Sequence, residues 1–185
     1  MSTQLEREIK LRFGSEAEAR AAIVAAGATP IRGRRLQEDC LLDTADEQLR
    51  QRRCVLRLRI EQGRSLLTYK GPVQPSDMKL REELETIVSD GDTLLRLLRE
   101  LGYDVWFRYQ KYREEFGGDD VIVALDETPI GTFVEIEGGE RGIREMALAL
   151  GRSPSDYVAD SYRTIFWQYR TEHGLADADM LFEEP

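Results

Sequence analysis

Charged side chains recur at alternate positions in segments of this sequence that otherwise resemble β-strands. The first is LEREIKLRF at residues 5–13, in which Glu6, Glu8 and Lys10 have the same parity. Because successive side chains of a strand point to opposite faces, these three charges share one face. Glutamates without nearby histidine or cysteine offer the oxygen ligands that Mg²⁺ or Mn²⁺ prefers, and lysine and arginine complement phosphate oxygens. The segment therefore suggests a metal and phosphate chemistry.

The same parity of charge returns in later strand-like segments. It is seen in Arg57 and Arg59, in Lys70, in Arg81, Glu83 and Glu85, in Lys111 and Arg113, and in Glu135 and Glu137. The opposite faces carry Leu56 and Leu58, Leu80 and Leu84, and Val134 and Ile136. One such strand would simply face water with its charges, but so many repeats, each with an apolar face that must be buried, favour a charged interior. About eight strands suffice to close a barrel around it.

Strands and helices that would position these charges can be located from hydrophobic periodicity and capping signals. We expect strands at residues 5–13, 36–44, 55–60, 66–70, 78–88, 105–116, 121–126 and 132–137. We expect helices at residues 15–26, 93–101, 143–150 and 162–169, which would cover the apolar outer face of the sheet. The prediction is a barrel with amphipathic helices packed outside it.

Composition limits the classes of function that fit this sequence. The 185 residues, with 41% hydrophobic and 33% charged side chains, suit one globular domain. A formal net charge of −9 argues against a general nucleic-acid binder, so any phosphate site must be local. Cys40 and Cys54 lack the spacing of a zinc site, and His173 lies in a polar region. The N-terminal region shows no signal peptide or membrane span, which predicts a cytoplasmic protein without membrane contact.

The motif Glu6-x-Glu8-x-Lys10 resembles the ExExK signature of the CYTH superfamily, the triphosphate tunnel metalloenzymes. Further matches follow in order: LRLR with Arg57 and Arg59, TYKGP with Lys70, REELE with Arg81, KYR with Lys111, LDETPIGTFVEIEG with Asp126, and Ser161-Tyr162. The resemblance covers nearly the whole chain. One departure is Leu41, where many members have an aromatic residue following the equivalent of Asp39.

The resemblance implies an α+β fold, a closed eight-stranded antiparallel β-barrel at residues 1–170, followed by an acidic C-terminal tail at 171–185 that we expect to be loosely attached. It implies divalent metal ligands, Mg²⁺ or Mn²⁺ being the expected ions, among Glu6, Glu8, Glu83, Glu85, Asp126, Glu135 and Glu137. It implies triphosphate binding by Lys10, Arg57, Arg59, Lys70, Arg81, Lys111 and Arg113. Catalysis would fall to Lys10, Glu6 and Glu8, with Lys10 able to activate water if its pKa were lowered.

Three functions are compatible with these motifs. The favoured one is metal-dependent hydrolysis of a linear triphosphate, either inorganic tripolyphosphate or an organic triphosphate such as thiamine triphosphate. The alternatives are a class IV adenylyl cyclase, which would convert ATP to cyclic AMP and pyrophosphate, and a non-catalytic module that binds polyphosphate or nucleotide. The conspicuous carboxylates weigh against pure binding, because they place anions beside an anion.

Other residues have simpler interpretations. The basic clusters at residues 32–35 and 50–53 could bind RNA ends or polyphosphate, but solvated arginines are the preferred interpretation and a nucleic-acid partner is not expected. Trp106, Phe107 and Trp167 could stack on an organic end group, although core packing is the preferred role. An exposed barrel edge could support a homodimer.

Overall fold

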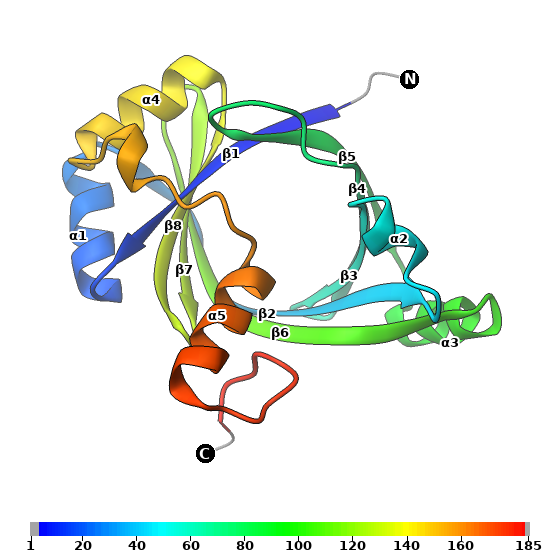
Figure 1. Ribbon diagram of the computed structural model, residues 1–185. Coiled ribbons are helices and arrows are strands. Elements are labelled where there is room, and N and C mark those ends of the chain that lie inside the picture. The colour runs from blue at the N-terminus through cyan, green and yellow to red at the C-terminus, as the bar shows by residue number, and fades with distance from the viewer. Residues whose placement is uncertain (1–3, 184–185) are drawn as a thin grey trace.

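Eight antiparallel strands form one closed barrel in the computed structural model, which describes residues 4–183 (Figure 1). The strands are β1 (Gln4–Phe13), β2 (Thr29–Thr44), β3 (Val55–Glu61), β4 (Arg64–Lys70), β5 (Lys79–Val88), β6 (Tyr103–Gly117), β7 (Val121–Thr128) and β8 (Gly131–Gly138). Around the barrel their order is β1-β5-β4-β3-β2-β6-β7-β8. The predicted α+β barrel is therefore confirmed. Residues 1–3 of the predicted barrel segment and residues 184–185 of the predicted C-terminal tail lie outside the described part of the chain.

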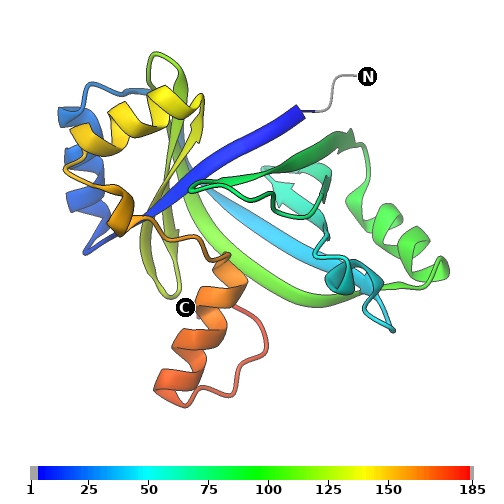
Figure 2. The same cartoon turned by 45° about the horizontal axis from the view of Figure 1, so that its top comes forward.

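Helices lie on the outside and at one end of this barrel (Figure 2). They are α1 (Glu16–Ala25), α2 (Gln48–Gln51), α3 (Gly91–Glu100), α4 (Glu140–Ala149) and α5 (Tyr162–His173), with a 3₁₀ turn at Pro154–Asp156. Ser15, Asp90 and Ser161 cap α1, α3 and α5 by accepting a hydrogen bond from a backbone N–H of the first turn. The short helix α2 is not apparent from the periodicity of the sequence. Among residues 4–183, no helix combines the length and the hydrophobicity needed to cross a membrane.

The apolar core lies between the barrel wall and the helices, and not on the barrel axis. Helices α1 and α4 lie side by side over β1, β7 and β8 (Figure 1), where Leu11, Ile136 and Ile143 are fully buried. Helix α3 covers Leu58 on the outer face of β3. Helix α5 packs at one end of the barrel against a cluster that includes Phe107. Burial of the alternate apolar side chains in these contacts leaves the charged side chains to line the interior.

Three expectations from the sequence differ from the structure. Leu84 was expected to be buried like Leu58, but it is 53% exposed because α3 packs on β4 and β6 and leaves it uncovered. Trp167 was expected to pack in the core, but it lies on α5 with its side chain exposed. The C-terminal segment is not loosely attached at Met180, which is fully buried and whose backbone forms hydrogen bonds with Arg108 and Gln110 of β6.

Leu58 and Leu84 give a direct test of where the core lies. Leu58→Ala is expected to lower the free energy of unfolding by about 2–5 kcal/mol, because it leaves a cavity under α3. Leu84→Ala, on the same barrel face but exposed, is expected to change it by no more than about 0.5 kcal/mol. Urea denaturation of both variants measures the difference. Similar losses in the two variants would contradict this placement of the core.

Candidate functional site

A cavity of about 730 Å³ runs through the barrel and lies within the size range of small-ligand sites. Its wall contains almost every site residue predicted from the sequence: Glu6, Glu8, Lys10, Arg57, Arg59, Lys70, Arg81, Glu83, Glu85, Lys111, Arg113, Glu135 and Glu137. The exception is Asp126, which is fully buried beneath the side chains that line the cavity. Antiparallel register explains the convergence, since β1 pairs with both β5 and β8 and places Glu8 opposite Lys79 and Glu137.

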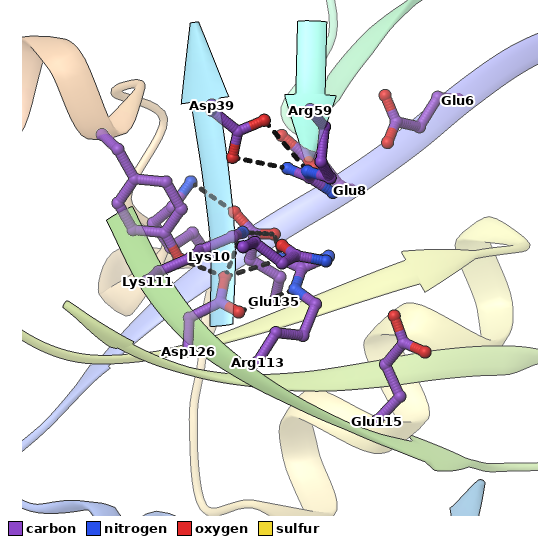
Figure 3. A network of polar contacts seen from close by, with 12 residues as sticks. Glu6, Glu8, Lys10, Asp39, Arg59, Lys111, Arg113, Glu115, Asp126 and Glu135 are labelled. Atoms are coloured by element: carbon purple, nitrogen blue, oxygen red, sulfur yellow. Dashed lines mark hydrogen bonds and ion pairs between the residues drawn. The ribbon is translucent and has the colours of Figure 1, made fainter. Parts of the chain in front are cut away.

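Asp126 joins three side chains below the cavity floor (Figure 3). It is fully buried, and its carboxylate accepts hydrogen bonds from Lys111 at 2.7 Å, from Arg113 at 2.6 and 2.7 Å, and from the Tyr162 hydroxyl at 2.6 Å. Both oxygens are therefore occupied by donors of the protein. The geometry favours an anchoring role for Asp126 over the role of metal ligand that the resemblance implied.

Asp39 forms a second anchor on the other side of the cavity (Figure 3). Its oxygens accept hydrogen bonds from Arg59 at 2.9 and 3.1 Å, and Arg57 lies 3.4 Å away. Burial acts to raise the pKa of Asp39, but Arg59 and Arg57 outweigh it and hold the pKa below its usual value. Asp39 was not among the predicted site residues. The available signal was its parity on β2, which it shares with Leu41 of the cavity wall.

Glu135 is surrounded by cations. Lys10 lies 3.0 Å from it, Lys111 lies 3.8 Å from it, and Arg113 also contacts it. Burial opposes the charged form of Glu135, yet the three cations keep its pKa well below its usual value. Burial also opposes the charged form of Lys10, but Glu135 and Glu8 outweigh it and raise the pKa of Lys10. The condition under which Lys10 was expected to activate water, a lowered pKa, is therefore not met, because its nearest charged neighbours are carboxylates.

The lowered amine pKa values belong to two other lysines. Burial, followed by the positive charge of Arg57, lowers the pKa of Lys70 to about 7. Burial, followed by the positive charge of Arg113, lowers that of Lys111 to about 8. Like charges crowded in one cavity destabilise each other's protonated form. The clustered cations thus leave an excess of positive potential, which a polyanion would neutralise.

Carboxylates gather at another part of the cavity wall. Glu6 lies 3.2 Å from Lys70, and Glu8 contacts Lys79. Glu137 forms no ion pair with a lysine or arginine among residues 4–183, and partial burial together with Glu6 and Glu8 raises its pKa to about 7. This mutual repulsion is the electrostatic condition that a bound cation relieves.

The donor set fits a hard divalent ion that is bound together with phosphate. Within residues 4–183, no three carboxylate, histidine or cysteine side chains are already gathered as a protein-only metal centre. Mg²⁺ is commonly held by one or two carboxylates plus substrate phosphates and water, which needs no such cage. Glu6, Glu8 and Glu137 could supply those carboxylates, beside cations that could hold the phosphates.

The two mouths of the cavity contain residues that were not predicted as site residues. At one mouth, Arg35 pairs with Glu61 at 2.9 Å and with Glu115 at 2.7 Å. The other mouth contains Trp106 of β6, with guanidinium groups from α2 and α5 against its ring. Trp106 is thus a cavity residue as well as a packing residue, whereas Phe107 beside it is fully buried as expected. Sequence periodicity gives no signal for contacts between ends of distant elements.

Several proteins are similar to this chain. A proposed adenylate cyclase from Methanocaldococcus jannaschii is 30% identical over 113 residues, which cover 60% of this chain and 65% of that protein, less than two thirds of its length. Among solved structures, a proposed adenylate cyclase from Vibrio parahaemolyticus has a TM-score of 0.77 at 22% identity, covering 90% of this chain and 99% of that one. A proposed adenylyl cyclase from Hippeastrum, described as having a dominant triphosphatase activity, has a TM-score of 0.67 at 17% identity, covering 89% and 95%.

The two structural similarities are at low sequence identity and support the barrel fold itself. The sequence profile of the CYTH domain matches residues 4–150, which include all eight strands and helices α1 to α4. With the charged cavity on the same strands, this match places the chain in the CYTH domain family.

Proposed function

We propose that this protein is a divalent-metal-dependent hydrolase of linear triphosphates. The observation that carries the proposal is that one cavity brings clustered cations together with carboxylates that repel one another. A polyanion and a divalent cation bound together would neutralise both sets of charges. The activity described for the Hippeastrum protein is of the same class.

In this proposal the phosphate clamp consists of Lys10, Arg57, Arg59, Lys70, Arg81, Lys111 and Arg113. Asp39 and Asp126 hold members of the clamp in place before substrate arrives, so little reorganisation is needed on binding. The buried Nε of Arg81 lies 3.5 Å from Glu83 but makes no hydrogen bond in the described chain, and it would gain one from a phosphate oxygen. The clamp would align the phosphate chain and neutralise charge that develops during phosphoryl transfer.

Glu6, Glu8 and Glu137 would hold Mg²⁺ or Mn²⁺, with Glu83 and Glu85 nearby in the cavity wall. A bound divalent ion supplies charge neutralisation of phosphate oxygens and activation of water. Lys10 Nζ remains protonated because of Glu135 and Glu8, so its proposed catalytic role is to stabilise the negative charge on the leaving phosphate oxygen. Glu135, enclosed by Lys10, Lys111 and Arg113, would position these cations.

A class IV adenylyl cyclase is the second candidate, and the names of the Methanocaldococcus and Vibrio proteins favour it. It would use the same clamp and metal but attack the α-phosphorus of ATP with the ribose hydroxyl. The two reactions differ in their products, because hydrolysis releases orthophosphate and cyclisation releases pyrophosphate with cyclic AMP. A module that only binds polyphosphate would yield neither set of products.

The activity can be tested with tripolyphosphate, thiamine triphosphate and ATP, each with Mg²⁺ or Mn²⁺, by measuring orthophosphate, pyrophosphate and cyclic AMP. We expect orthophosphate, and we expect Lys10→Ala to lower kcat/KM by roughly 10²–10³-fold, the scale of removing one donor to a developing charge. Arg12→Gln is the matched control, because Arg12 is on the same strand but is exposed and outside the cavity. Cyclic AMP as the main product from ATP would contradict the hydrolase proposal.

The roles of Asp126 and Glu137 can be separated by stability measurements in EDTA. Asp126→Asn should lower the free energy of unfolding by about 3–5 kcal/mol, because it removes the closest carboxylate partner of buried Lys111 and leaves Glu135 alone to balance Lys111 and Arg113. Glu137→Gln should raise the melting temperature at pH 8.5 by removing repulsion with Glu6 and Glu8. The folded pKa of about 7 lies above the ordinary value of 4.5, so this carboxyl costs stability progressively as pH rises from about 4.5 through 7. The gain should therefore be smaller at pH 6 than at pH 8.5, and it should vanish only near pH 4.5.

Thermal scans of both variants at the two pH values provide the measurement. The result that would overturn these roles is a stable Asp126→Asn protein together with a destabilised Glu137→Gln protein in EDTA.

A further inference from the structure

One mouth of the cavity carries guanidinium groups that the phosphate clamp does not include. Arg50 belongs to α2, Arg53 to the turn that follows it, and Arg163 to the first turn of α5. All three line the same continuous cavity as the clamp, together with Trp106. Val55, the cross-strand partner of the clamp residue Lys70, also lines the cavity wall. We call the set of Arg50, Arg53, Arg163 and Trp106 the arginine mouth.

The charges of the arginine mouth are only partly compensated by the protein. Arg50 pairs with Asp43 at 3.2 Å and with Glu47 at 3.1 Å. Arg53 and Arg163 have no carboxylate within ion-pair distance in the part of the chain that the structure describes. Burial, and then the positive charge of Arg50, lowers the pKa of Arg163. Neighbouring cations that repel one another in a partly enclosed place favour a bound anion.

Trp106 brings two of these cations together. Its ring centroid lies 4.2 Å from the Arg50 guanidinium carbon and 5.1 Å from that of Arg163. Cation–π contacts of this kind fix the guanidinium groups while leaving their N–H donors free for other partners. Because two cations already lie against the indole, the mouth is better suited to an anionic group than to a neutral planar base.

The backbone at Arg53 adds an independent observation. Its φ of 58° lies in the left-handed region, which an arginine adopts at a cost and which asparagine or glycine adopts more readily. A side chain kept in such a conformation at a cavity mouth is a candidate for function. The opposite mouth differs, since Arg35 there is paired with Glu61 and Glu115. Arg64 lines the cavity near Glu61 without an ion pair among the described residues, so what distinguishes the arginine mouth is the pair of guanidinium groups held against Trp106.

We propose that the arginine mouth is a subsite for a further phosphate group beyond the three in the clamp. The ligand class that fits is a linear inorganic polyphosphate of at least four phosphates, whose additional phosphate would contact Arg53 and Arg163. This inference rests on the proposed function in placing a triphosphate unit within the barrel. It adds that chain length is sensed outside the clamp, by residues of α2 and α5.

Binding can be measured by isothermal titration calorimetry with tripolyphosphate and tetrapolyphosphate as probes. EDTA is included so that metal-dependent turnover does not interfere with the measurement. Because only binding is measured, the result tests the subsite separately from the proposed hydrolase activity. We expect the wild-type protein to bind tetrapolyphosphate more tightly, and Arg53→Asn and Arg163→Gln each to reduce that preference by roughly 3- to 10-fold, the scale of a partly exposed charge-assisted contact. Affinity for tripolyphosphate should change less than about twofold, the scale of a lost long-range charge.

Arg52→Gln is the matched control, because Arg52 precedes Arg53 on the same turn but does not line the cavity. Arg53→Asn should leave the melting temperature unchanged or higher, since asparagine tolerates a positive φ, so a loss of preference could not come from unfolding. Equal affinity of the wild-type protein for both probes would overturn the subsite. A loss of tripolyphosphate and tetrapolyphosphate affinity to the same extent in the Arg53→Asn and Arg163→Gln variants would also overturn it.

Discussion

The structure depends on how ionised side chains are kept inside a closed barrel. Moving charges out of water is costly unless each finds partners of opposite sign. The barrel meets this condition by placing single carboxylates between pairs of cations, with Asp126 between Lys111 and Arg113 and Asp39 beside Arg59. The same contacts fix the directions of the cationic side chains. Pairing that is needed for folding thus also prepares the cavity to receive phosphate.

Anchoring extends from the cavity to the apolar core through Tyr162. Its hydroxyl donates to Asp126, while its ring lies against Lys10 and Lys111, with their Nζ atoms 4.5 and 4.9 Å from the ring centroid. The same ring packs with Phe133 in the core cluster under α5. Helix α5 is therefore coupled to the position of the clamp lysines. A change in the packing of this helix would alter the cavity without touching a charged residue.

The barrel and most of its inner wall could be predicted from the sequence because the two-residue period of a strand is a local property. Parity alone assigned Glu8, Arg59 and Lys70 to one surface. It could not reveal that Asp126 has its oxygens filled, because Tyr162 reaches it from a helix 36 residues away in sequence. Nor could it show that Leu84 lacks a covering helix, which depends on where α3 lies after the chain leaves β5.

The pKa values of the lysines were equally out of reach, because they depend on all the charges that the strands bring around the cavity. Lys10 and Lys70 each lie opposite a glutamate, Glu135 and Glu83, yet Glu135 and Glu8 raise the pKa of Lys10 while burial and Arg57 lower that of Lys70. Met180 illustrates the same limit for the C-terminal segment, since its burial requires a groove formed by β6. What sequence reasoning missed is in each case a meeting of elements that are distant along the chain.

Charge is distributed unevenly along the cavity, and this gives a bound ligand a direction. Arg35 and Leu41 of β2 pair with Arg113 and Phe107 of β6, about 20 Å apart at the rise of an extended strand. At the Arg35 end, Arg32 and Arg35 pair with Glu61 and Glu115 although Arg64 does not, while at the Trp106 end Arg53 and Arg163 have no carboxylate partner within residues 4–183. In the proposed function, an anion held by the clamp would lie in the same cavity as Glu6, Glu8 and Glu137, beside which additional negative charge is unfavourable unless a cation accompanies it. The charge distribution that would favour a polyanion would thus also favour a divalent metal bound with it.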